Sequence, residues 1–175
     1  LSLEEMSKIL SYAKKKGVYS LDTAIDYGES ESNLGKLNVD TWDIISKISN
    51  LRNVDQNIDN FTVSKVRESI DLLKIKRLDT LLLHTPKDLL DLNRNNIYSA
   101  IDKCKEQGLC SKIGISSYSY QEVKIIIAKY KIDVVQFPLN IFNRELLESG
   151  LIELLKEKGI EVHVRSIFLQ GLLLM

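Results

Sequence analysis

Segments with strand patterns and segments with helical patterns alternate along all 175 residues of the chain. Short apolar runs typical of buried strands are each followed by a segment with apolar residues at helical spacing. Strict alternation favours a parallel sheet with helices outside it, because neighbouring parallel strands need a crossover connection. The predicted strands span residues 18–24, 42–47, 77–84, 111–116, 132–137 and 160–166.

The segments between these strands carry helix start and stop signals. Capping boxes are predicted from Ser2 to Glu5 and from Ser119 to Glu122, and the last helix is expected to be irregular at Gly150. The predicted helices span residues 2–17, 30–37, 62–75, 96–108, 119–130 and 143–159.

Two architectures satisfy this alternation: an open, doubly wound sheet and a (β/α)8 barrel. The doubly wound dinucleotide fold usually carries G-x-G-x-x-G after its first strand, and this chain has no such motif. No linker or composition shift divides the chain, so residues 1–175 are expected to form a single domain.

Composition narrows the choice of partners. The chain has 24 basic and 24 acidic residues, which gives no electrostatic reason to expect nucleic acid or a membrane surface. No apolar run approaches the ~20 residues of a membrane span, and no signal peptide opens the chain. The two cysteines, Cys104 and Cys110, are expected to be structural thiols in a reducing compartment rather than metal ligands. A cytoplasmic protein without a metal site is therefore expected.

Every predicted strand carries a polar or ionisable residue at or near its carboxyl end. Since the functional face of a parallel α/β protein lies at the carboxyl ends of its strands, we expect these groups to converge on one pocket. Tyr27 lies just beyond the end of the first strand, and Asn140 lies beyond the end of the fifth. The strand-end residues, in order, are Asp22, Lys47, His84, Ser116 with Ser117, Gln136, and Arg165 with Ser166.

Four of these residues suit one reaction. A Tyr hydroxyl has an ordinary pKa of ~10, and a nearby Lys ammonium is expected to lower the pKa of Tyr27. A carboxylate would hold Lys47 in place, and His84 would donate a hydrogen bond to a substrate oxygen. This set suits protonation of a carbonyl oxygen while hydride reaches its carbon. Side chains supply no hydride, so a nicotinamide cofactor is implied.

Each residue taken alone also has a structural explanation. Tyr27 could pack in the core, Lys47 could extend to the surface, and His84 could be a hydrogen-bonded structural residue. Their positions at consecutive strand ends favour the catalytic interpretation. Asp26 competes for the carboxylate role, but Asp22 is favoured because it lies at the strand terminus.

Several motifs carry a family resemblance. "DTAIDYGESESNLG" matches the pattern Asp-Thr-Ala followed by Tyr-Gly-x-Ser-Glu-x-x-Leu-Gly. "IISK", "RLDTLLLHTP", "CSKIGISSYS" and "VVQFPLNIFNR" are similar to four further segments of the same family, in the same order. On these motifs the chain resembles the aldo-keto reductase superfamily over essentially its whole length.

The resemblance implies a (β/α)8 barrel that binds NAD(P)H, usually NADPH, and reduces a small-molecule aldehyde or ketone. NADH remains possible, and the oligomeric state is not indicated. The resemblance implies that Tyr27 is the general acid and that Lys47 and Asp22 adjust its acidity. It also implies that His84 orients the substrate carbonyl. Ser116, Ser117 and Gln136 occupy the positions that hold the nicotinamide carboxamide.

The chain departs from the family pattern at two cofactor positions. Ser117 stands where the family usually has Asn, and Arg165 stands where many members have an aromatic ring that stacks on nicotinamide. Arg165 could stack on nicotinamide in the same way, bind an anionic substrate, or pair with a neighbouring strand end. Arg165 and Ser166 are both assigned to the cofactor site.

By the same resemblance, the chain is expected to be a fragment of about six β/α units that lacks the first and last barrel strands. A typical barrel needs ~250 residues. The alternative to a reductase is a catalytically silent nicotinamide-binding module on the same barrel. Four aromatic residues either line a substrate pocket or pack in the core: Tyr118, Tyr120, Phe142 and Phe168.

Overall fold

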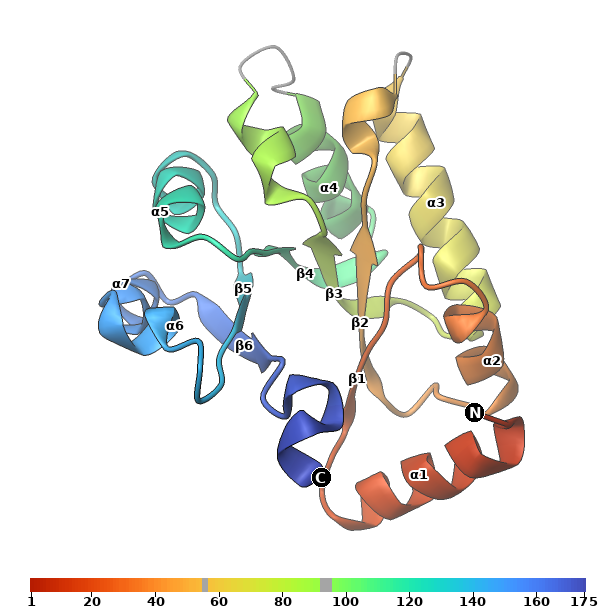
Figure 1. Ribbon diagram of the computed structural model, residues 1–175. Helices are drawn as coiled ribbons and strands as arrows, with labels where there is room; N and C mark the ends of the chain where they lie inside the picture. The colour runs from red at the N-terminus through yellow and green to blue at the C-terminus, as the bar shows by residue number, and fades with distance from the viewer. Residues whose placement is uncertain (55–56, 92–95) are drawn as a thin grey trace.

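The structure, a computed structural model, describes residues 1–54, 57–91 and 96–175. Within these ranges it contains one sheet of six parallel strands (Figure 1). The strands are β1 (Ser20–Asp22), β2 (Asp43–Ile48), β3 (Leu78–Leu83), β4 (Cys110–Ser116), β5 (Val134–Pro138) and β6 (Glu161–Arg165).

The order of the strands in the sheet decides between the two candidate architectures. Each strand pairs with the strands before and after it in the sequence, in the order β1-β2-β3-β4-β5-β6. A doubly wound sheet reverses its strand order at a switch point, whereas a barrel adds each new strand on the same side. Figure 1 shows the sheet curling, with helices outside it. The fold is therefore an incomplete (β/α)8 barrel of six strands, as predicted.

Helices occupy the predicted crossovers. The predicted helix of residues 143–159 is divided at Gly150, which has a φ of 71°. No helix in the described part of the chain is long and apolar enough to cross a membrane. The α-helices are α1 (Leu3–Lys15), α2 (Ser30–Lys36), α3 (Ile58–Leu73), α4 (Asn96–Glu106), α5 (Tyr120–Lys129), α6 (Glu145–Glu148) and α7 (Leu151–Glu157). The 3-10 helices are η1 (Leu51–Asn53), η2 (Pro86–Leu90) and η4 (Leu169–Leu174).

Of the two predicted capping boxes, one forms completely. The Ser2 hydroxyl accepts from the Glu5 backbone N–H, and the Glu5 carboxylate accepts from the Ser2 backbone N–H. At α5 the Ser119 hydroxyl caps Glu122, but the Ser119 N–H donates to the Ser117 hydroxyl instead of Glu122. The second prediction is wrong in this half, because the Ser117 hydroxyl accepts the N–H that the Glu122 carboxylate was expected to bind.

The main core lies between the outer face of the sheet and the helices. Alternate residues of each strand point outward, for example Leu81 and Leu83 of β3, and both are fully buried in this core. A smaller cluster forms on the inner face from Ile45, Leu82 and Val134. The inner face of the curled sheet therefore has its own apolar layer, separate from the layer beneath the helices.

Helix α2 is held against the sheet and α3 by a buried carboxylate and a glycine contact. Glu31 accepts hydrogen bonds from Ser46 of β2 at 2.6 Å and from Ser69 of α3 at 2.7 Å. At Gly35 the two helices approach so closely that an added Cβ would lie 2.0 Å from the backbone oxygen of Leu72. Because α2 directly follows the loop that carries Tyr27, this packing also supports the site.

We predict that Gly35→Ala destabilises the protein by about 1 to 3 kcal/mol, because the added methyl group forces α2 away from α3. An ordinary Gly→Ala change inside a helix stabilises by roughly 1 kcal/mol, so the close approach reverses the expected sign. Denaturant unfolding of the full-length gene product measures the effect. The control is Lys36→Ala at the exposed neighbouring position, expected within about 0.5 kcal/mol of wild type. Unchanged or increased stability of the Gly35 variant would contradict the packing argument.

Candidate active site

The polar strand-end residues lie one step along the strands from the inner apolar layer. Side chains on a strand repeat with period two, so residues two positions apart share a face. Ile45, Leu82 and Val134 form the inner cluster, and two positions further on stand Lys47, His84 and Gln136. Lys47, His84 and Gln136 therefore lie on the inner face, next to this layer of apolar side chains.

Lys47 makes the central ion pair of this site. Its side chain is only 2% exposed, and its Nζ lies 2.6 Å from Oδ1 of Asp22 and 2.8 Å from the carbonyl oxygen of Thr23. A surface role for Lys47 is therefore ruled out. Asp26, the rival carboxylate, instead accepts a hydrogen bond from Ser49. Asp22 is the carboxylate that holds the lysine.

The loop between β1 and α2 is tied to β2 and places Tyr27 over the ion pair. The N–H of Thr23 donates to the carbonyl of Ile45 at 2.8 Å, and the N–H of Ile25 donates to the carbonyl of Lys47 at 3.0 Å. The parallel ladder therefore continues past the end of β1. The N–H of Tyr27 then closes a turn onto the Ala24 carbonyl at 3.0 Å. Backbone hydrogen bonds thus fix the position of the tyrosine.

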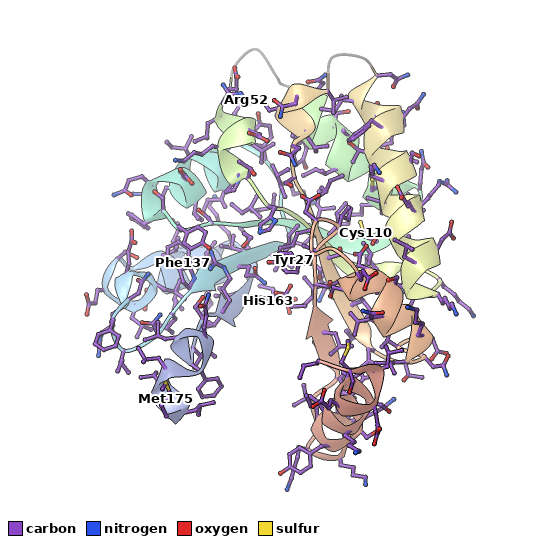
Figure 2. All side chains as sticks on the ribbon, turned by 45° about the vertical axis from the view of Figure 1, so that its right-hand side comes forward. Tyr27, Arg52, Cys110, Phe137, His163 and Met175 are labelled. Carbon is purple, nitrogen blue, oxygen red and sulfur yellow. The ribbon has the colours of Figure 1, made fainter. Side chains whose placement is uncertain are left out.

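Tyr27 lies against both Lys47 and His84. The Nζ of Lys47 is 5.3 Å from the centroid of the tyrosine ring, and the His84 ring meets the same ring edge-on with centroids 5.9 Å apart. Tyr27 is half exposed, and Figure 2 shows it near the centre of the molecule. A small molecule can therefore reach a tyrosine that contacts a buried cation and an imidazole.

The pKa of Tyr27 is raised above its ordinary value of about 10. Partial burial is the largest cause, followed by the negative charge of Asp22 and by Tyr118, whereas the positive charge of Arg165 acts in the opposite direction. The sequence predicted a pKa lowered by Lys47, and the structure corrects this. The ammonium of Lys47 is already paired with Asp22, whose own charge disfavours the phenolate.

The pKa of His84 is lowered. Burial is the largest cause, the charge of Lys47 is the next, and the charge of Arg165 adds to them, while Asp26 and Asp22 act in the opposite direction. At neutral pH the imidazole is therefore uncharged and carries one N–H donor. Tyr27 keeps its proton under the same conditions.

A second polar pair lies at the ends of β4 and β5. The hydroxyl of Ser116 donates to Oε1 of Gln136 at 2.9 Å, and both residues are buried. The neighbouring Ser117 is also buried, but its hydroxyl accepts from Ser119 and lies within hydrogen-bond distance of Glu122. Ser116 and Gln136 thus form one unit, while Ser117 is engaged in the turn before α5.

Arg165 and Ser166 complete the set at the end of β6. Arg165 lies two positions beyond His163 on the inner face and pairs in register with Pro138 of β5. Its guanidinium stacks on the ring of Tyr118 with 3.9 Å to the ring centroid. Ser166 has a φ of 61°, and its carbonyl accepts from the side chain of Asn140 at 3.3 Å.

Sequence reasoning missed two partners in this site. The Thr23 carbonyl that binds Lys47 is a backbone atom, which no side-chain pattern could have revealed. The aromatic partner of Arg165 is Tyr118, which is 71% exposed and so does not pack in the core. Phe142 and Phe168 are also exposed, whereas Tyr120 packs against the core. Among the described residues, no group of three His, Cys, Asp or Glu side chains is placed to hold a metal ion.

Comparison with known proteins identifies the family of this barrel. All residues from 1 to 175 match the sequence model of the Aldo/keto reductase family. The chain belongs to this family. The resemblance found in the sequence motifs is thereby confirmed, together with the fold that it implied.

Curated and solved relatives agree with this assignment. Rhazimal reductase 2 of Alstonia scholaris is 27% identical over 94% of this chain, and the chain spans 57% of that relative's length. The structure of aldo-keto reductase AKR11C1 from Bacillus halodurans superposes with a TM-score of 0.78 at 21% identity, covering 98% of this chain and 58% of that one. A Gox0644 variant in complex with NADPH gives a TM-score of 0.72 at 22% identity, covering 97% and 61%.

In this aldo/keto reductase chain, we predict that Asp22→Asn destabilises the protein by about 1 to 3 kcal/mol, because buried Lys47 loses its charged partner. The cost stays below the ~3–5 kcal/mol of a fully buried pair because the Asp22 side chain is 41% exposed. Denaturant unfolding at neutral pH provides the measurement. Asp26→Asn is the matched control and is expected to change stability by less than about 1 kcal/mol. A larger loss at position 26 than at position 22 would reverse the assignment of the lysine's partner.

Proposed function

We propose that the protein reduces an aldehyde or ketone to an alcohol with a nicotinamide cofactor, and that Tyr27 donates the proton. The observation that carries this proposal is the contact of Tyr27 with uncharged His84 and with buried Lys47, which is paired with Asp22. Membership of the Aldo/keto reductase family supports the reaction class. A silent binding module would have no need of a buried lysine beside an accessible tyrosine.

Each of the four residues would have a separate role in the reaction, set by its charge. A carbonyl oxygen placed beside Tyr27 and His84 would accept a hydrogen bond from each. A bound reduced nicotinamide would supply the hydride. As negative charge develops on the oxygen, Tyr27 would transfer its proton, and the ammonium of Lys47 would stabilise the phenolate that remains. Asp22 would hold that ammonium in position through its hydrogen bond.

The donor set at β4 and β5 fits the carboxamide of a nicotinamide. A carboxamide has both a donor and an acceptor, and the Ser116–Gln136 pair offers a hydroxyl and an amide at buried neighbouring positions. Because Oε1 of Gln136 already accepts from Ser116, its Nε2 group remains as a donor for a ligand. We propose that these two residues hold the carboxamide.

NADPH is the proposed cofactor, with NADH as the alternative. A Gox0644 variant with a similar fold has been solved in complex with NADPH, and this similarity of fold supports the choice. Ser117 and Ser166 also stay within the proposed cofactor site. The hydroxyl of Ser117 is less available to a cofactor, because it already accepts a hydrogen bond from the Ser119 N–H in the turn before α5.

We predict that Tyr27→Phe lowers kcat for carbonyl reduction by about 100-fold or more, because the proton donor is removed while the ring remains. NADPH oxidation with a reactive test aldehyde is followed at saturating cofactor, using the full-length gene product. NADPH binding, measured by fluorescence titration, is expected to remain within about twofold of wild type.

The control for this variant is Tyr12→Phe, an exposed tyrosine on α1 that is expected to leave turnover unchanged. Equal loss of activity in both variants would contradict a specific role for Tyr27. If the wild type binds NADPH but reduces no member of a carbonyl panel, the silent binding module becomes the better description.

The raised pKa of Tyr27 predicts the pH dependence of both reaction directions. A pKa above 10 means that the hydroxyl keeps its proton throughout the neutral range, so kcat/KM for reduction should stay level from about pH 7 to 10 and fall above it. Alcohol oxidation needs the phenolate and should rise with pH over the same range. Steady-state rates from pH 6 to 11 test this, and a reduction rate that falls already between pH 7 and 9 would contradict the raised pKa.

A further inference from the structure

Arg165 is a cation whose surroundings point to a ligand. Its Nη2 donates to the backbone carbonyl of Ser117 at 3.3 Å, and its guanidinium plane rests on the ring of Tyr118. These two contacts fix the orientation of the guanidinium but leave most of its five N–H donors without a protein acceptor among the described residues. The side chain is held in place without being neutralised.

Arg165 also has no carboxylate partner in the described part of the chain. Arg52 pairs with Asp91 and Arg144 pairs with Glu148, so other arginines of this protein have counter-ions. The Nε of Arg165, in contrast, is shielded from solvent and has no hydrogen-bond partner. A cation that is partly withdrawn from water and unpaired attracts an anion more strongly than a solvated one.

The position of Arg165 relates this unpaired charge to the reacting groups. By strand alternation it stands on the inner face, two residues beyond His163. Its charge lowers the pKa of both Tyr27 and His84, so it lies within electrostatic reach of the two residues that would hold a carbonyl oxygen. The acidic strand-end residue Asp22 is paired with Lys47.

We propose that Arg165 binds an anionic group of the carbonyl substrate, so that the preferred substrates are aldehydes or ketones that carry a carboxylate. This inference rests on the proposed reductase function and specifies its substrate class. A planar guanidinium matches the two oxygens of a carboxylate. The sequence left three roles open for Arg165. Pairing of Arg165 with a neighbouring strand end is not observed among the described residues. Stacking on nicotinamide would need a face of the guanidinium, and Tyr118 already covers one of its two faces.

The experiment compares matched aldehydes that differ in a single charge. Succinic semialdehyde is paired with butanal, and 4-formylbenzoate is paired with 4-methylbenzaldehyde, which covers two separations between the anion and the carbonyl. We expect wild-type kcat/KM to be at least tenfold higher for the charged member of at least one pair. Arg165→Gln should lower kcat/KM for that member by about 10- to 100-fold and change the neutral member far less.

Further variants test whether the effect comes from the charge of Arg165 or from a change in structure. NADPH binding tests whether Arg165 acts on the substrate or on the cofactor. Arg165→Lys keeps the charge and should recover part of the discrimination, while Arg144→Gln removes an ion-paired arginine elsewhere and should leave it unchanged. NADPH affinity is measured for each variant. If Arg165→Gln weakens NADPH binding but leaves the preference for the charged aldehyde intact, Arg165 acts on the cofactor and the inference is overturned.

A binding measurement decides the question without turnover. Calorimetric titration of wild type with 4-(hydroxymethyl)benzoate and with 4-methylbenzyl alcohol should show tighter binding of the charged compound, and Arg165→Gln should abolish the difference. Equal affinities in the wild type, together with equal kcat/KM in both aldehyde pairs, would overturn the inference even if the variant failed to fold. Turnover of neutral aldehydes in that case would leave the proposed reductase function standing.

Discussion

The ion pair between Lys47 and Asp22 is the interaction on which the candidate site depends. Burial of an ammonium that is only 2% exposed is costly unless nearby groups replace the water it has lost. Asp22 and the Thr23 carbonyl do so, and both come from the end of β1 and the residue after it. The same segment continues the ladder onto β2 and then turns to present Tyr27. One structural arrangement thus pairs two strands, buries a charge and places the proton donor.

The inner face of the sheet supports this arrangement by layering. Ile45, Leu82 and Val134 form a buried apolar cluster, and polar residues follow two positions later on the same strands. Close packing in that layer extends to Gly114, where an added Cβ would lie 2.0 Å from the carbonyl oxygen of Val134. The polar groups therefore rest on a rigid apolar base, which keeps their mutual distances constant.

Charge balance in the site sets the protonation states of the reacting groups. Partial burial is the largest cause of the raised pKa of Tyr27, and the charge of Asp22, which pairs with Lys47, is the next, so Tyr27 retains its proton at neutral pH. His84 remains uncharged because it is partly buried beside two cations. The error in the sequence-based pKa prediction has a clear origin: it counted the lysine as a free charge, although the carboxylate that positions the lysine also cancels much of its effect on the tyrosine.

The sequence by itself determined the alternation of elements, the break at Gly150, the family and the identity of the strand-end residues, because periodicity, glycine conformation and local motifs are properties of short segments. It favoured Asp22 over Asp26 by position, but it could not show which carboxylate pairs with Lys47, foresee the Thr23 carbonyl as a lysine ligand, or decide what Arg165 faces. Only the tertiary structure decided these points, through the sequential strand order and the register of each pair. The physical reason is that burial and electrostatic pairing arise between residues distant in the chain, whereas secondary structure follows from neighbours.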